Sequence, residues 1–228
     1  MKRIIILFLC SFLLASCNTT STIIEWVDFV RINGKKYEAT YSEIIAEQTF
    51  IGEEIGQVQF KVADEITDVD YKTRNGDAAY LEKGTKIYAV KKKPECIAIK
   101  DESVINGYKL YRLDSSKNDE FHIDKDSNTA AITKVELYSD DTAPSLLRTL
   151  SSKTDIQALI TLLKQGEINN DYSPNIAKGD PISYKIIFYG GDRLAHQFPM
   201  FFDGEKWYWS PSDTTILPTE IESFVKPK

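Results

Sequence analysis

The sequence predicts an α+β protein with a β-rich first half and a mixed second half. In the first half, short runs of alternating apolar residues are separated by turn residues, as in antiparallel sheets. The second half adds one clear amphipathic helix between further strands. We therefore expect an N-terminal antiparallel sheet or small barrel over residues 25–120, and a C-terminal antiparallel sheet with one or two packed helices over residues 129–228.

The first half opens with a predicted hairpin. Asn33-Gly34 separates two apolar runs at 26–32 and 36–41, and both positions of such a turn favour positive φ. Residues 57–62 alternate, with Val58, Phe60 and Val62 on one face. Three more short strands are expected at 85–91, 96–100 and 108–113.

A polar stretch at 114–128 is the expected boundary between the two halves. A strand is then predicted at 132–138. Ser152 and Asp155 fit a capping box, in which each side chain satisfies a free backbone N–H at the start of a helix. The apolar residues that follow, Ile156, Leu159, Ile160 and Leu163, have helical spacing. Gly166 stands where the helix should end.

The last third contains three more predicted elements. Residues 183–189 form a strand, and Asp203-Gly204 joins strands at 198–202 and 207–210 into a second hairpin. Pro218 begins a final helix, because proline is favoured in the first helical turn.

The N-terminus has the pattern of an export signal. Lys2 and Arg3 precede an apolar run at 4–14, which is too short to span a bilayer. Leu14-Ala15-Ser16-Cys17 then resembles the lipobox of bacterial lipoproteins. The resemblance implies removal of the signal peptide 1–16, diacylglycerol and palmitate on Cys17, and a lipidated tether at 17–24. The alternative is a secreted protein whose Cys17 lies at the cleavage site by chance.

Charge and cysteine content narrow the choice of partners. The net charge is −6, and loss of Lys2 and Arg3 with the signal peptide makes it −8. An acidic protein is repelled by nucleic acid and by anionic headgroups, so neither is an expected partner. Cys10 leaves with the signal peptide and Cys17 carries lipid, so Cys96 is left without a disulfide partner and is expected to be a small buried apolar residue.

Motifs for metals, cofactors and catalysis are weak or missing. Asp124, Asp126 and Asn128 occupy the first ligand positions of a calcium loop, but the required glycine and glutamate are replaced by Thr129 and Val135. His122 and His196 are the two histidines, and they form no zinc motif. No catalytic residue, metal site or cofactor is therefore predicted.

The aromatic residues of the second hairpin are the candidate binding surface. Trp207 and Trp209 share one side of their strand, and Tyr208 points to the other. If the indoles face the helix, they belong to the core. If they face solvent, they form a platform for a glycan or a peptide.

Several motifs resemble a family of uncharacterised cell-surface lipoproteins from Gram-positive bacteria. They are residues 26–30, the segment 75–85, and the aromatic hairpin together with Leu217-Pro218. The resemblance implies an extracytoplasmic setting at the cell membrane and a two-part α+β domain, and it is silent on activity.

The favoured function is a non-enzymatic binding or interaction module, held on the membrane by lipid on Cys17, with an envelope protein or a glycan as partner. The alternative is a surface hydrolase whose carboxylates are brought together by the fold. A ligand-binding subunit of an importer is less favoured, because the chain lacks the repeated strand–helix units of two α/β lobes.

Overall fold

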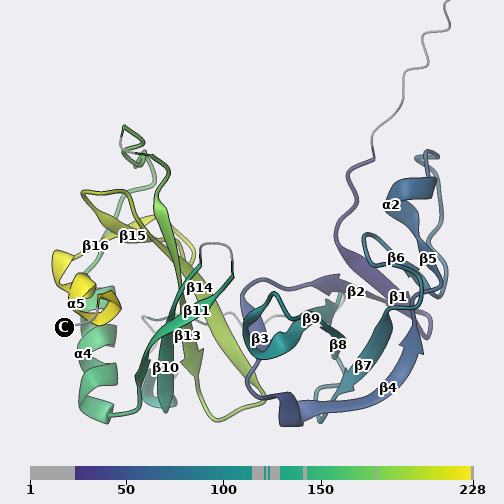
Figure 1. The fold of residues 1–228 in the computed structure, drawn as a ribbon, viewed down its shortest axis with the longest axis horizontal. Coiled ribbons are helices and arrows are strands. Elements are labelled where there is room, and N and C mark those ends of the chain that lie inside the picture. The colour runs from purple at the N-terminus through teal and green to yellow at the C-terminus, as the bar shows by residue number, and fades with distance from the viewer. Residues whose placement is uncertain are drawn as a thin grey trace, which may run out of the picture.

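The computed structural model describes residues 24–114, 121, 123, 129–140, 143–177 and 179–226. The signal peptide, Cys17 and most of the tether lie outside these residues, as do His122, Asp124, Asp126 and Asn128. Over the described residues the chain forms two β-sheets with few helices (Figure 1). This is an α+β fold with a low helix content.

The first sheet has eight strands in the order β4-β7-β8-β9-β2-β1-β6-β5. Its two outermost strands, β4 and β5, are separated in sequence only by Val58 and Gln59, so the sheet curls until its edges approach. Its strands are β1 (Phe29–Ile32), β2 (Lys35–Ala39), β4 (Ile51–Gln57), β5 (Phe60–Lys61), β6 (Asp77–Ala78), β7 (Lys86–Val90), β8 (Cys96–Lys100) and β9 (Tyr108–Leu113).

The inner face of this curled sheet holds its own core. The core residues are Val30, Ile32, Tyr37, Val58, Ala78, Ile87, Ile97, Ile99 and Tyr111. The predicted hairpin is confirmed: β1 pairs antiparallel with β2, and Asn33 and Gly34 both have positive φ. The strand expected at 57–62 is split into the end of β4 and the short β5. Between them, the Val58 N–H donates to the Thr85 carbonyl and the Gln59 N–H donates to the Gly76 carbonyl. The chain bends there to pass between the two edges, and Val62 begins the short helix α2 (Val62–Glu65).

The second sheet follows the order β11-β10-β13-β14-β15-β16-β12, and β3 also pairs with β14. Helices α4 and α5 cover one face of this sheet (Figure 1). The elements are β3 (Glu43–Ile45), β10 (Lys134–Ser139), β11 (Ser145–Leu150), β12 (Glu167–Ile168), β13 (Ile182–Tyr189), β14 (Leu194–Phe202), β15 (Trp207–Trp209), β16 (Thr215–Leu217), α4 (Lys153–Lys164) and α5 (Glu222–Val225). The described residues also contain the 3₁₀ turns η2 (Gln48–Phe50), η3 (Ile105–Gly107) and η4 (Thr219–Ile221).

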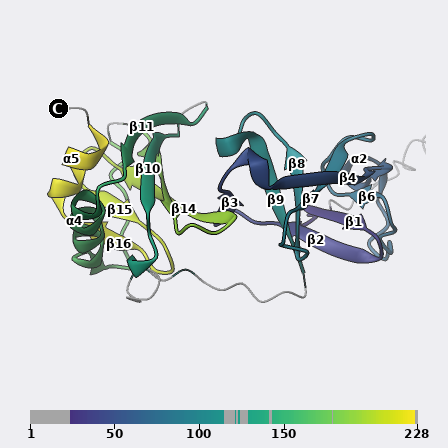
Figure 2. The same cartoon turned by 90° about the horizontal axis from the view of Figure 1, so that it is seen from below.

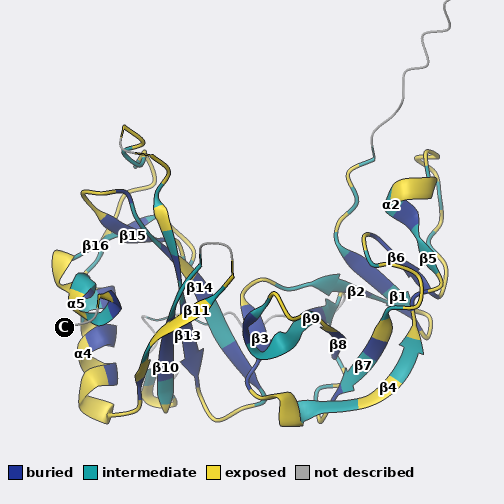
Figure 3. Cartoon of the chain, viewed as in Figure 1, coloured by how far each residue is buried: buried dark blue, intermediate teal, exposed yellow. Residues whose placement is uncertain are grey.

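Helix α4 matches its predicted pattern. The Ser152 side chain accepts a hydrogen bond from the Asp155 N–H, and the four expected apolar residues are buried toward the sheet, as the dark face of α4 shows in Figure 3. Gly166 has a different role from the expected one. It has no positive φ, but a Cβ there would lie 2.5 Å from Thr215 Cγ2. Glycine therefore allows β16 to approach the end of the helix.

Strand β3 joins the two sheets. It belongs to the first half of the sequence, yet Ile45, Ile44 and Glu43 pair with the first three residues of β14. In Figure 2, β3 lies between the two sheets, where β14 reaches it. Apolar clusters on both sides of β3 contain residues from both halves; they include Ile44, Ile105, Ile187 and Tyr189 in one, and Ile45, Cys96, Leu110 and Leu194 in the other. The two sheets thus share buried surface.

Candidate binding pocket at the junction of the two sheets

The segment 40–42 carries the chain from β2 to β3, and both sheets hold its backbone. The Thr40 N–H donates to the Leu110 carbonyl of the first sheet at 3.1 Å. From the second sheet, the Gln197 N–H donates to the Ser42 carbonyl at 2.9 Å, and the Gln197 side-chain amide donates to the Tyr41 carbonyl at 2.8 Å. The crossover is therefore fixed from both sides.

A pocket of about 380 Å³ opens beside this crossover. It is lined by Glu38, Ala39, Thr40, Tyr41, Ser42, Arg112, Leu113 and Asp114. The Tyr41 side chain is 68% exposed, and the Lys109 ammonium lies 5.4 Å from its ring centroid. Pockets for small ligands have volumes of this size and often occur where domains meet.

Of the charged groups at the pocket, one is ion-paired within the protein and two are accessible to a ligand. Both Arg112 Nε and Nη2 donate to Glu43 Oε2, at 2.9 and 2.5 Å, and the two side chains are only 12% and 10% exposed. The carboxylates of Glu38 and Asp114 are more open, and Lys36 Nζ lies 2.5 Å from the first and 4.0 Å from the second. The pocket thus offers hydrogen-bond acceptors to a ligand, while its arginine is held by the protein itself.

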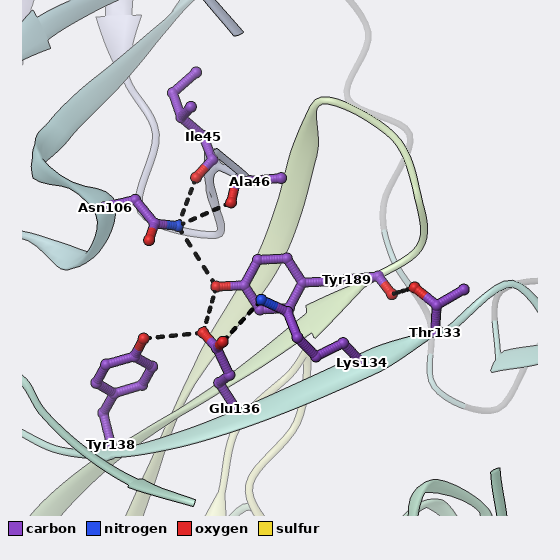
Figure 4. Close-up of polar contacts among 8 residues, drawn as sticks. All are labelled: Ile45, Ala46, Asn106, Thr133, Lys134, Glu136, Tyr138 and Tyr189. Carbon is purple, nitrogen blue, oxygen red and sulfur yellow. Dashed lines mark hydrogen bonds and ion pairs between the residues drawn. The ribbon is translucent and has the colours of Figure 1, made fainter. Parts of the chain in front are cut away.

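A buried carboxylate lies at the core of the junction, on the sheet face opposite α4. Glu136 accepts hydrogen bonds from Tyr189 Oη at 2.7 Å, Lys134 Nζ at 2.8 Å and Tyr138 Oη at 2.9 Å (Figure 4). Burial by itself would raise the pKa of Glu136, but these three donors outweigh it and bring the pKa below its ordinary value. Burial and the hydrogen bond to Glu136 raise the pKa of Tyr189. Glu136 is therefore an ionised carboxylate that accepts three hydrogen bonds from the protein.

Asn106 links this network to β3. Its side-chain amide donates to the carbonyls of Ile45 at 2.8 Å and Ala46 at 3.3 Å, and it lies 3.5 Å from Tyr189 Oη (Figure 4). Asn106 has φ +62°, a left-handed conformation that asparagine tolerates better than most residues. The turn η3 of the first half is thereby bonded to both β3 and β13.

A second polar contact closes the junction at its edge. Lys93 Nζ lies 2.8 Å from Asp192 Oδ2, which joins the β7–β8 turn to the β13–β14 turn. The hydrogen bond from Lys93 lowers the pKa of Asp192. Neighbouring Arg193 places its guanidinium 5.5 Å from the Phe50 ring centroid, so the β13–β14 turn also contacts η2.

The cysteine and the histidine that the sequence singled out, Cys96 and His196, pack against other residues inside the protein. Cys96 is buried, and burial raises the pKa of its thiol to about 12. His196 pairs with Glu43 across β14 and β3, stacks on Phe121 at 4.8 Å, and has its pKa lowered by burial. Over the residues that the structure describes, no three His, Cys, Asp or Glu side chains gather into a metal site.

The hairpin tryptophans lie in the core. Trp207 and Trp209 are each 1% exposed and share an apolar cluster with α4. Tyr208 is also buried, on the other face of the sheet, where it stacks on Phe201 at 5.2 Å. These three side chains do not form an exposed platform, because the helix and the loops around the sheet cover them.

Most residues of the junction were missed in the sequence. Glu136 stands in an otherwise apolar run, Val135-Glu136-Leu137, and such a lone acid in a strand could have suggested a buried partner. Asn106-Gly107 has the residue types of a turn, but nothing local indicates that the asparagine amide reaches β3. The pocket residues 38–42 look like the end of an ordinary strand.

The chain matches no protein-family model, and no curated protein and no solved structure matches it. Within the described ranges, no helix is both long enough and apolar enough to cross a membrane.

Proposed function

We propose that this chain is a lipid-anchored lipoprotein on the extracytoplasmic side of the cell membrane, and that its domain binds a polyhydroxylated ligand such as a sugar unit of an envelope glycan. The anchor is supported by the sequence: a short basic segment, an apolar run and the four residues Leu14-Ala15-Ser16-Cys17. Two acyl chains on one residue suffice for stable membrane attachment.

The pocket beside the crossover is the observation that carries the binding proposal. Its backbone is held by both sheets, so a ligand would meet preformed walls and little ordering entropy would oppose binding. Glu38, Asp114 and the hydroxyls of Thr40 and Ser42 can accept hydrogen bonds from sugar hydroxyls. The exposed ring of Tyr41 can stack against the apolar face of a sugar ring. The two carboxylates disfavour an anionic ligand.

The test is calorimetric titration of residues 17–228 with neutral N-acetylglucosamine oligomers. We expect saturable binding that weakens roughly tenfold in Tyr41→Ala, the equivalent of about 1.4 kcal/mol. Tyr80→Ala is the matched control, because it removes another exposed tyrosine that does not line the pocket. Absence of saturable binding, or equal affinity in both variants, would contradict the pocket assignment.

A surface hydrolase is the second candidate, favoured by one observation: Glu38 and Asp114 line the same pocket, and both lie within 4.0 Å of the Lys36 ammonium. Paired carboxylates of this kind perform glycoside hydrolysis. Incubation of the same oligomers with the protein distinguishes the two functions. Cleavage that Glu38→Gln abolishes would establish the hydrolase, whereas intact oligomers with retained binding support the binding module.

A further inference from the structure

An exposed apolar patch surrounds the point where the described chain begins. Val27, Val69 and Tyr80 are 58%, 67% and 48% exposed, respectively. We call these three side chains the N-terminal patch. They belong to the end of the first sheet that carries β1, β6 and α2, at one extremity of the molecule (Figure 1).

Two of the three residues adjoin Trp26, and Val69 belongs to the turn before Tyr71, whose ring packs on Trp26. Tyr80 Oη donates to the Trp26 carbonyl at 2.6 Å, and Val27 is the next residue in the chain. Val69 lies in the turn closed by the Tyr71 N–H and the Asp68 carbonyl, and the Tyr71 ring packs edge-on against the Trp26 ring at 6.4 Å. Beneath them is a small core of Phe29, Val62 and Ala79. The patch therefore stands on packed core residues.

Its distance from Cys17 is limited by the chain. Ile24 lies seven residue steps after Cys17, and a fully extended chain spans at most about 3.6 Å per step, or about 25 Å. A lipid on Cys17 would therefore keep the patch within one such length of the bilayer surface. Tethering also makes contact with the membrane intramolecular, which raises its effective concentration to the millimolar range or above.

We propose that the N-terminal patch inserts into the interface of the membrane that holds the anchor, an inference that rests on the proposed lipidation of Cys17. Valine side chains transfer favourably into the acyl region, and tyrosine is enriched at the membrane–water interface. The charges nearby are mostly acidic: Asp68 and Asp70 flank Val69 in the sequence, and Lys61 Nζ lies 2.9 Å from Asp64 and 2.7 Å from Glu82. Attraction to anionic headgroups is therefore not expected, and the patch binds by apolar insertion into a zwitterionic membrane.

The experiment attaches residues 17–228 through Cys17 to a maleimide lipid in phosphatidylcholine vesicles whose acyl chains are brominated. Cys96 does not compete for the maleimide, because it is buried and its pKa is raised to about 12. Bromine quenches tryptophans at the membrane. Trp26 is partly exposed, whereas Trp207 and Trp209 are buried in the second sheet, and Trp26→Phe identifies its share of the emission.

We expect lipid-dependent quenching of Trp26 that falls by roughly half or more in Val27→Asp/Val69→Asp. Leu146→Asp/Leu147→Asp is the matched control: it removes two exposed apolar side chains from β11, adds the same charge, and should leave the quenching unchanged. No quenching, or equal quenching in both double variants, would overturn the docking proposal. Because the tether is supplied chemically, this result is independent of whether cells lipidate Cys17.

Discussion

The hydroxyl of Tyr189 donates to the carboxylate of Glu136 at 2.7 Å, inside the junction where the two sheets meet. Removal of this donor leaves a buried anion with two partners instead of three. We expect Tyr189→Phe to lower the free energy of unfolding by about 1.5–3 kcal/mol, the range for hydrogen bonds to charged groups. Denaturant titration measures the loss. Tyr41→Phe, which changes an exposed tyrosine, should fall within about 0.5 kcal/mol of the parent; equal losses in the two variants would contradict the role of the network.

Asn106 combines an unusual backbone conformation with an amide that bonds β3, and two substitutions separate these roles. Asn106→Gly keeps the left-handed backbone and removes the amide, whereas Asn106→Ala removes the amide and adds backbone strain. We expect alanine to destabilise the protein by about 1 kcal/mol more than glycine. Thermal unfolding of the two variants measures the difference. A glycine variant that is the less stable of the two would refute this account of η3.

The junction carboxylates make stability depend on pH with a definite sign. The pKa values of Glu136 and Asp192 are lower in the folded protein than their ordinary values of 4.5 and 3.8. The folded state therefore binds fewer protons, so the stabilisation is complete above these ordinary values and is lost as pH falls through the folded ones. We expect the melting temperature to be level near neutral pH and to decline below about pH 4.5. A smaller decline in Glu136→Gln checks the assignment; an unchanged slope would contradict it.

Gly166 is required for space, and a matched glycine tests this. A Cβ at Gly166 would lie 2.5 Å from Thr215 Cγ2 and 3.1 Å from the Ile216 carbonyl oxygen, whereas at Gly190 its nearest neighbour would be 3.6 Å away. Neither glycine has a positive φ. We expect Gly166→Ala to cost about 1–3 kcal/mol by overpacking, and Gly190→Ala to be nearly neutral. Chemical denaturation of both variants gives the comparison, and similar costs would argue against the close approach of β16.

The sequence carried enough information for the elements with strong local patterns. The hairpin at Asn33-Gly34 and the helix after Ser152 were both predicted correctly, because turn chemistry and helical periodicity are local. Strands β4 and β11 were missed for physical reasons. β4 contains two glycines and two glutamates, and β11 is an edge strand whose residues are mostly exposed, so neither shows an apolar alternation.

The junction could not be predicted in the same way. β3 has only three residues, and its pairing with β14 joins positions about 150 residues apart in the sequence. The bonds of Asn106 and Glu136 depend on that pairing. The aromatic hairpin left both a core and a surface position open, since alternation fixes which side chains share a face but not which face is covered.

The lipid anchor is the central claim, and mass spectrometry of the N-terminal peptide tests it most directly. The full-length chain would be expressed in a bacterium fed an alkyne-tagged fatty acid, with Cys17→Ala as the control. We predict a mature protein that begins at Cys17, carries diacylglycerol on its thiol and partitions with membranes, while the control stays unlabelled. An unmodified Cys17, or label that persists in Cys17→Ala, would contradict the account.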